Sequence, residues 1–338
     1  MKKLKYIFLA ILLFGAFGIF YAYTIFFGPT VYQETVLYIP SESSYEVLLG
    51  ELKANDLIAN ESLFSLLAEK MNLKNNVHAG RYVFEEGTNS YELISKLRGG
   101  MQTPVKLLIN NVNFKEDLAA KIASQVEVDS LSVWNLIHDE EQISAMGYNS
   151  DNVMCLFIPN TYEVYWNLGL ESLLSKFKAS HAQFWNATRT AKANSLGLSP
   201  NEVFVLASIV EKEYKHLDER KRIAGVYVNR LGLGMKLQAD PSCKFALGDL
   251  SIKRVLTVHT EYDHPYNTYY YAGLPPGPIC LPETSTIEDV LNAEDHNYLY
   301  FCAKEDLSGY HSFSKNYSDH LKAARLYQAA LNKLQIYE

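Results

Sequence analysis

Residues 199–241 read SPNEVFVLASIVEKEYKHLDERKRIAGVYVNRLGLGMKLQADP and begin with the signals of a helix start. Ser199 is a residue type that caps helices, and Pro200 suits the first helical position. Glu202 completes an S-x-x-E capping box with Ser199. The apolar residues that follow recur at helical spacing, so this stretch predicts a long helix around which the rest of the chain is organised.

Two carboxylates close this predicted helix, and only one lies on its apolar face. Glu213 is seven residues after Leu206 and four after Ile209, which places all three on one side. Glu211 points to another side. A carboxylate held against apolar surface has a raised pKa and can stay protonated near neutral pH, as a proton donor must. Glu213 is therefore a candidate general acid, although it could also mark where the stripe reaches the surface.

The composition describes a globular protein of more than one domain. With 338 residues, 48% of them hydrophobic and 20% charged, two or three domains are expected. A formal charge of -7 argues against nucleic acid as a partner. The four cysteines, Cys155, Cys243, Cys280 and Cys302, form no C-x-x-C pair, so zinc and thioredoxin-like sites are disfavoured. One or two disulfides and four buried thiols both remain open.

The N-terminus contains a candidate membrane anchor. Residues 6–27 carry no charge, and three lysines precede them within residues 1–5. The next positive charge is Lys53, so residues 1–5 should stay inside the cell and the rest should be exported. A signal peptide would have a shorter apolar core and a small-x-small cleavage site, so a transmembrane helix is favoured.

Residues 31–100 predict a small unit in the order strand, helix, helix, strand, with one more helix before Gly99 and Gly100. Residues 101–150 predict a strand and two helices that link the halves of the chain. The remainder, 151–338, mixes long helices with a Pro-rich loop and a late strand. The chain is thus α+β, and no P-loop, H-E-x-x-H, G-x-S-x-G or dinucleotide motif occurs.

Several motifs in this last part resemble the endolytic murein transglycosylase family, also called YceG-like. They are ASIVEKE at 207–213, NRL at 229–231, LQ at 237–238 with DP at 240–241, YNTY at 266–269 and GLPPGPI at 273–279. They keep the family's order from about residue 155 to 325. One departure is Asn160, where the family segment usually has Asp. Another is Tyr214, where lytic transglycosylases commonly have Ser or Thr, so the hydroxyl that orients the acid is expected elsewhere.

The resemblance implies a membrane-anchored lytic transglycosylase of the cell wall. Its anchor would lie in the bacterial cytoplasmic membrane, residues 31–100 would be a LysM-like module, and 151–338 would be the catalytic domain. Such enzymes cut glycan strands of peptidoglycan between MurNAc and GlcNAc and leave 1,6-anhydroMurNAc ends, without cofactor or metal. Glu213 would be acid and then base, and Glu211 would be the reserve. Wall-synthesis proteins are the expected protein partners.

The same resemblance favours a set of substrate-binding residues: Asn229, Arg230, Gln238, Asp240, Tyr266, Asn267, Thr268, Tyr269, Pro275 and Pro276. Amides and a guanidinium can hold acetamido or carboxylate groups, and tyrosines on a proline-stiffened loop can form a wall against sugars. The alternatives are a helix C-cap at 229–230 and a rigid crossover with packed tyrosines. His311 is more readily a local hydrogen-bond partner than a base.

Two other functions fit the sequence. A muramidase-type hydrolase would need a second carboxylate, for which Asp240 is the best candidate. A peptidoglycan-binding scaffold would need no catalytic group. We expect anhydro ends from a transglycosylase and reducing ends from a hydrolase.

Overall fold

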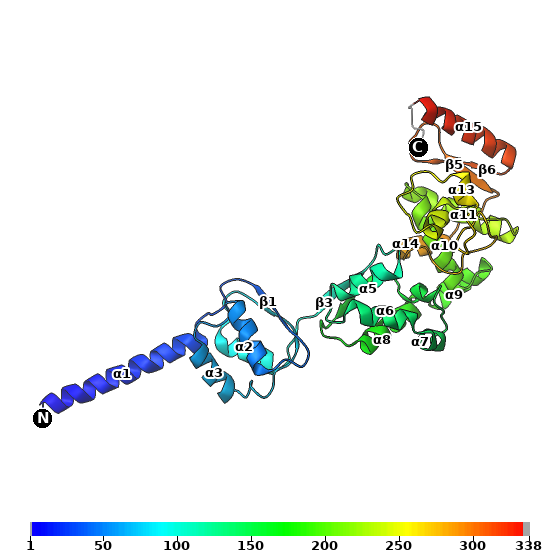
Figure 1. Cartoon of the computed structure of the whole chain (residues 1–338). Coiled ribbons are helices and arrows are strands. Elements are labelled where there is room, and N and C mark those ends of the chain that lie inside the picture. Colours follow the sequence, from blue (N-terminus) through cyan, green and yellow to red (C-terminus); the bar gives the residue numbers. More distant parts are fainter. Residues whose placement is uncertain (1, 334–338) are drawn as a thin grey trace. The chain divides into compact units, whose positions relative to one another are not determined.

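The computed structural model describes residues 2–333 and divides the chain into two compact units. The first holds residues up to 107 with 125–128 and 162–169, and the second holds 108–124, 129–161 and 170 onward. Figure 1 shows the order of the elements along the chain. Within the predicted linking region, 101–150, residues 101–107 and 125–128 belong to the first unit and the others to the second.

The first unit begins with α1 (Lys2–Phe27), whose segment from Lys5 to Phe27 has a mean hydropathy of 2.1 and is not buried. The helix is long and apolar enough to cross a membrane. It is followed by β1 (Thr35–Ile39), α2 (Tyr45–Ala54), α3 (Glu61–Lys70), β2 (Gly80–Phe84) and α4 (Ser90–Arg98). The strand–helix–helix–strand order is the predicted one.

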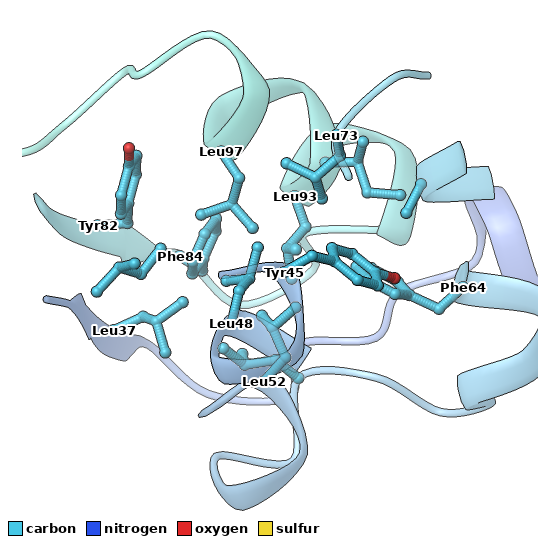
Figure 2. Packing of buried hydrophobic residues seen from close by; sticks show 14 of the residues in the cluster. Leu37, Tyr45, Leu48, Leu52, Phe64, Leu73, Tyr82, Phe84, Leu93 and Leu97 are labelled. Atoms are coloured by element: carbon cyan, nitrogen blue, oxygen red, sulfur yellow. The ribbon is translucent and has the colours of Figure 1, made fainter. Parts of the chain in front are cut away.

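Strands β1 and β2 pair antiparallel, with Leu37 opposite Tyr82. Alternate residues of β2 point inward, where they meet the buried faces of the three helices. Figure 2 shows this core, in which Tyr82 and Phe84 pack with leucines of α2 and α4. The unit therefore has a hydrophobic core of its own.

Two strands lie where the chain passes between the units: β3 (Val105–Ile109) and β4 (Asn160–Val164) form a two-stranded sheet. Between them come α5 (Lys115–Ala123), α6 (Ser130–His138), α7 (Glu140–Ala145) and the short 3-10 helix η1 (Val153–Leu156). Helices α8 (Leu170–Phe184) and α9 (Ala187–Ser195) then lead to the central helix.

The centre of the second unit is α10 (Pro200–Glu213), which begins with the predicted capping box between Ser199 and Glu202. Every residue from 203 to 210 is buried. The sequence predicts one apolar face, whereas the helix is enclosed all round. The reason is that α14 (Thr284–Leu291) and the Pro-rich loop cover the side of Ser208, whose Oγ accepts a hydrogen bond from the backbone N–H of Ile279 at 3.0 Å.

Shorter elements surround this helix: the 3-10 helix η2 (Leu217–Glu219), α11 (Arg220–Gly232), α12 (Asp240–Ala246) and α13 (Thr257–Thr260). Arg220 joins α11 to α14 through a salt bridge of 2.6 Å to Asp289. The chain continues with β5 (Tyr300–Ala303) and β6 (His311–Ser314), an antiparallel pair. Figure 1 shows α15 (Tyr317–Lys333) beside that pair.

Candidate active site

A cavity of about 520 Å³ opens in the second unit at the end of α10. Glu213, the last residue of that helix, lies in its wall. Tyr227 comes from α11, Asp240 begins α12, and Tyr269 comes from the tyrosine-rich segment 262–271, called the tyrosine loop below. Together with residues as far along the chain as Tyr327, these side chains surround one carboxyl group.

Glu213 accepts a hydrogen bond on Oε1 from the hydroxyl of Tyr227, at 2.9 Å. Desolvation raises the pKa of Glu213 to about 7, and the negative charge of Asp240 adds to the rise. The Tyr227 hydroxyl and the charge of Lys244 oppose it. A carboxyl group in this setting is substantially protonated at neutral pH and can donate its proton.

Tyr227 is the hydroxyl expected from outside the E-K-E motif. It is fully buried on α11, and burial raises its pKa well above the ordinary value. Its hydroxyl is therefore a neutral donor throughout the physiological pH range. Tyr214, which directly follows Glu213, donates instead to Glu211 at 3.4 Å.

Glu211 lies on a different side of α10 and lines no part of this cavity. Its Oε2 accepts hydrogen bonds from the hydroxyl of Thr286 and from the backbone N–H of Glu283, at 3.3 Å for the second. Glu211 therefore fastens α14 to the end of α10. The helical-face argument separates the two carboxylates in the way the structure has them.

Asp240 and Tyr269 form one edge of the cavity. The hydroxyl of Tyr269 donates to Oδ1 of Asp240 at 2.6 Å. Burial, followed by the charge of Asp240, raises the pKa of Tyr269. Gln238 lies beside them with a backbone φ of 53°, and its N–H donates to the carbonyl of Thr268 at 3.1 Å. This strained position holds the segment 238–240 against the tyrosine loop.

Asn229 and Arg230 of the NRL motif donate hydrogen bonds to backbone carbonyls and do not extend freely into the cavity. Arg230 borders the cavity, yet its Nε donates to the carbonyl of Leu299 at 2.6 Å and its Nη1 to that of Leu237 at 2.7 Å. Asn229 Nδ2 donates to the carbonyls of His296 and Tyr298, at 2.7 and 3.1 Å. Both residues thus join α11 to the segment that leads into β5.

Hydrogen bonds within the chain hold the tyrosine loop in place. Asn267 is fully buried, and its amide donates to three backbone carbonyls of residues 259–262, at 2.8–3.3 Å. The hydroxyl of Thr268 accepts from the N–H of Ala239 at 3.0 Å. Tyr266, Pro275 and Pro276 lie outside the lining of the Glu213 cavity.

The comparisons with known proteins agree with this arrangement of motifs. A family model described as the YceG-like family matches residues 37–326. The chain belongs to the YceG-like family. It is 30% identical over 310 residues to an endolytic murein transglycosylase of Bacillus subtilis, which covers 87% of this chain and 85% of that protein.

More distant relatives extend the comparison. An endolytic murein transglycosylase of Streptococcus pneumoniae is 27% identical over 315 residues, and the match spans 83% of this chain but 56% of that protein. A solved structure of a YceG-like protein from Listeria monocytogenes has a TM-score of 0.57 and 27% identity. That match covers 86% of this chain and 98% of the Listeria chain. The mixed α+β architecture is therefore that of the YceG-like fold.

The sequence did not predict a further part of the cavity lining, which the C-terminal part of this YceG-like chain supplies. It consists of residues from β5, β6 and α15, namely Tyr300, Phe301, Cys302, Ala303, His311, Tyr317, His320 and Tyr327. The buried Glu219 holds the ring of His311 in place, since Nδ1 of His311 lies 2.8 Å from Oε2 of Glu219. The one feature of the sequence that could have indicated this wall is the helical spacing of the rings of Tyr317 and His320.

The four cysteines of this YceG-like chain are free thiols. Among the residues that the structure describes, no group of three or more His, Cys, Asp or Glu side chains is arranged to hold a metal ion. Asn160, the departure from the family segment, is exposed and lines a different cavity, beside the paired Arg189 and Glu288.

Proposed function

We propose that this protein is an endolytic lytic transglycosylase that cuts peptidoglycan glycan strands, with Glu213 as its catalytic acid and base. One observation carries the proposal: a carboxyl group with a pKa of about 7, held by a tyrosine hydroxyl, in the wall of a cavity of about 520 Å³. The relatives named endolytic murein transglycosylases supply the substrate class.

In the first step, protonated Glu213 gives its proton to the oxygen that links MurNAc C1 to the next GlcNAc. The C1–O bond breaks, and C1 becomes an oxocarbenium-like centre. In the second step, the Glu213 carboxylate takes the proton of the MurNAc C6 hydroxyl while that oxygen bonds to C1. The result is a 1,6-anhydro ring and a regenerated acid, with no water consumed.

Neighbouring residues prepare Glu213 for both steps. The Tyr227 hydroxyl donates to Oε1 and stabilises the carboxylate that exists between the steps. Burial, and after it the charge of Asp240, raise the pKa of Glu213 and keep the resting group protonated. We assign sugar contacts to Tyr269, Asp240 and Gln238, whose side chains border the cavity, and to the aromatic residues of β5, β6 and α15.

Four other residues of the predicted substrate-binding set support this site through contacts within the chain. Asn229, Arg230, Asn267 and Thr268 use their polar atoms on the chain itself. We propose for them, and for Glu211, the role of holding α10, α11, α12 and the tyrosine loop in place. Tyr266 lines a second, smaller cavity.

We further propose that α1 anchors the protein in the bacterial cytoplasmic membrane, with residues 1–5 inside and the catalytic part outside. The lysines before the apolar span support this orientation. For residues 31–100 we propose a LysM-like module, supported by the β1–α2–α3–β2 order and its separate core. Wall-synthesis proteins remain expected partners.

Asp240 makes a muramidase-type hydrolase the second candidate, because it is a second carboxyl group in the same cavity. In that reaction water, rather than the C6 hydroxyl, would attack C1. The products separate the two reactions, since hydrolysis leaves reducing MurNAc ends.

The deciding experiment is mass spectrometry of peptidoglycan digested by the full chain in detergent micelles, beside Glu213→Gln and Glu211→Gln. We expect anhydro products from the parent, none from Glu213→Gln and a reduced yield from Glu211→Gln. Loss of products in Glu211→Gln alone would move the acid to that residue. Reducing ends would favour the hydrolase, and no cutting by the parent would favour a binding scaffold.

A further inference from the structure

A second cavity in the unit that contains Glu213 takes no part in the mechanism above. Its volume is about 210 Å³. Aromatic rings form one side of it: the centroids of Phe114 and Phe245 lie 5.3 Å apart, and those of Phe245 and Tyr266 lie 4.9 Å apart. Trp134 and Met154 also line it. Such a surface suits the apolar face of a sugar or a methyl group.

One polar atom at this cavity has no partner. Asn113 Oδ1 is buried and accepts no hydrogen bond from the described part of the chain. The nearby N–H groups of Asn113 and Phe114 do not satisfy this oxygen, because both donate to Oδ2 of Asp117, at 3.4 and 3.1 Å. A buried acceptor without a donor is unfavourable, so this atom points to a donor that arrives with a ligand.

A donor lies two residues away. Lys115 lines the same cavity, and desolvation lowers its pKa, while the charge of Asp151 acts in the opposite direction. The ammonium group is therefore poorly solvated and gains from an oxygen acceptor. An acetamido group has one N–H, one carbonyl oxygen and one methyl, which match the Asn113 acceptor, the Lys115 donor and the aromatic rings.

Two structural elements contribute residues both to this cavity and to the Glu213 cavity. Helix α12 carries Asp240, at the first cavity, and Phe245, at the second. At about 1.5 Å per helical residue, these two positions are about 7–8 Å apart along the axis. The tyrosine loop repeats the pattern with Tyr269 and Tyr266. Helix α12 and the tyrosine loop therefore each contribute residues to both cavities.

We propose that the cavity bordered by Asn113, Lys115 and Phe245 is a subsite for the acetamido group of an N-acetylhexosamine, in a strand whose reacting part occupies the Glu213 cavity. Asn113 Oδ1 accepts the amide N–H, Lys115 donates to the carbonyl oxygen, and the methyl lies against the rings. This inference rests on the proposed function for the identity of the strand.

The test is calorimetric binding to the full chain in detergent micelles, with Glu213→Gln present throughout to prevent cutting. The probe is the β-1,4 tetrasaccharide of N-acetylglucosamine, and the control ligand is cellotetraose, which lacks acetamido groups. Asn113→Leu and Lys115→Met should each weaken the acetylated probe about five- to tenfold, as expected for one lost hydrogen bond. Asn194→Leu, on the exposed side of α9, is the matched control.

The outcomes separate this inference from the proposed function. Unchanged affinity in both variants, equal losses for both sugars, or no binding of the probe by the Glu213→Gln parent would reject the subsite. Selective loss of the acetylated probe supports the subsite even if the protein released no anhydro products from peptidoglycan. Thermal unfolding of each variant checks that the loss comes from the cavity and not from the fold.

Discussion

Replacing Glu213 with Gln should make the protein inactive and, above pH 5, more stable. Folding moves the pKa of this carboxyl group from an ordinary 4.5 to about 7, so its ionised form is disfavoured in the folded state. Below pH 4.5 the group is protonated in both states and contributes nothing. As the pH rises from 4.5 to 7 the unfolded state releases its proton first, and stability falls until both states are ionised.

The size of the effect follows from that difference in pKa. At about 1.4 kcal/mol for each pKa unit, full desolvation would correspond to about 3 kcal/mol. Glu213 keeps part of its surface open to the cavity, so we expect about 2 kcal/mol. Gln can still accept the hydrogen bond from Tyr227, which leaves the local geometry in place.

The assay is urea unfolding of the parent and the variant at several values from pH 4 to pH 8. The free energies of unfolding should agree at pH 4, diverge through pH 6 and differ by a constant amount above pH 7. Glu261→Gln is the control, because it removes an exposed carboxylate and leaves Glu213 in place. A difference that is the same at pH 4 and pH 8 would refute the raised pKa and, with it, our reason for choosing Glu213.

Three other substitutions test the surroundings of this group. Asp240→Asn removes the charge that helps to raise the pKa of Glu213, so the alkaline limb of the kcat/KM–pH profile should move to lower pH, by up to about one unit; a limb that moves upward would contradict this. Tyr227→Phe removes the donor that lowers the pKa of Glu213, so the limb should move to higher pH and kcat should fall about tenfold or more; an unchanged profile would show that the hydroxyl is unimportant. Arg230→Leu should lower the free energy of unfolding by about 2–3 kcal/mol, because buried carbonyls lose their donor; a variant of parental stability and weakened substrate binding would restore Arg230 to the sugar contacts.

The features that the sequence predicted well depend on local patterns. Ser199, Pro200 and Glu202 define the start of α10 through contacts within four residues. The spacing from Leu206 to Glu213 is enough to separate Glu213 from Glu211, because side-chain direction on a helix follows from position. The strand–helix–helix–strand order of the first unit was visible for the same reason.

The features that it missed depend on contacts between distant segments. Nothing near Glu213 in the sequence indicates that its hydrogen-bond donor is Tyr227, on the next long helix. The close packing of the Pro-rich loop is another such feature, since a Cβ at Gly277 would lie 1.9 Å from the carbonyl oxygen of Asp151. The glycine allows this loop to pack closely against the chain, which a motif alone does not reveal.

The wall supplied by β5, β6 and α15 also decides when the site can form. Its last contributor, Tyr327, leaves the ribosome more than a hundred residues after Glu213. At about 5–20 residues per second, that delay is of the order of ten seconds. Until then the cavity around Glu213 lacks the part of its lining that β5, β6 and α15 supply. If the proposed function is right, a nascent chain would therefore stay inactive until α15 completes the lining of the cavity.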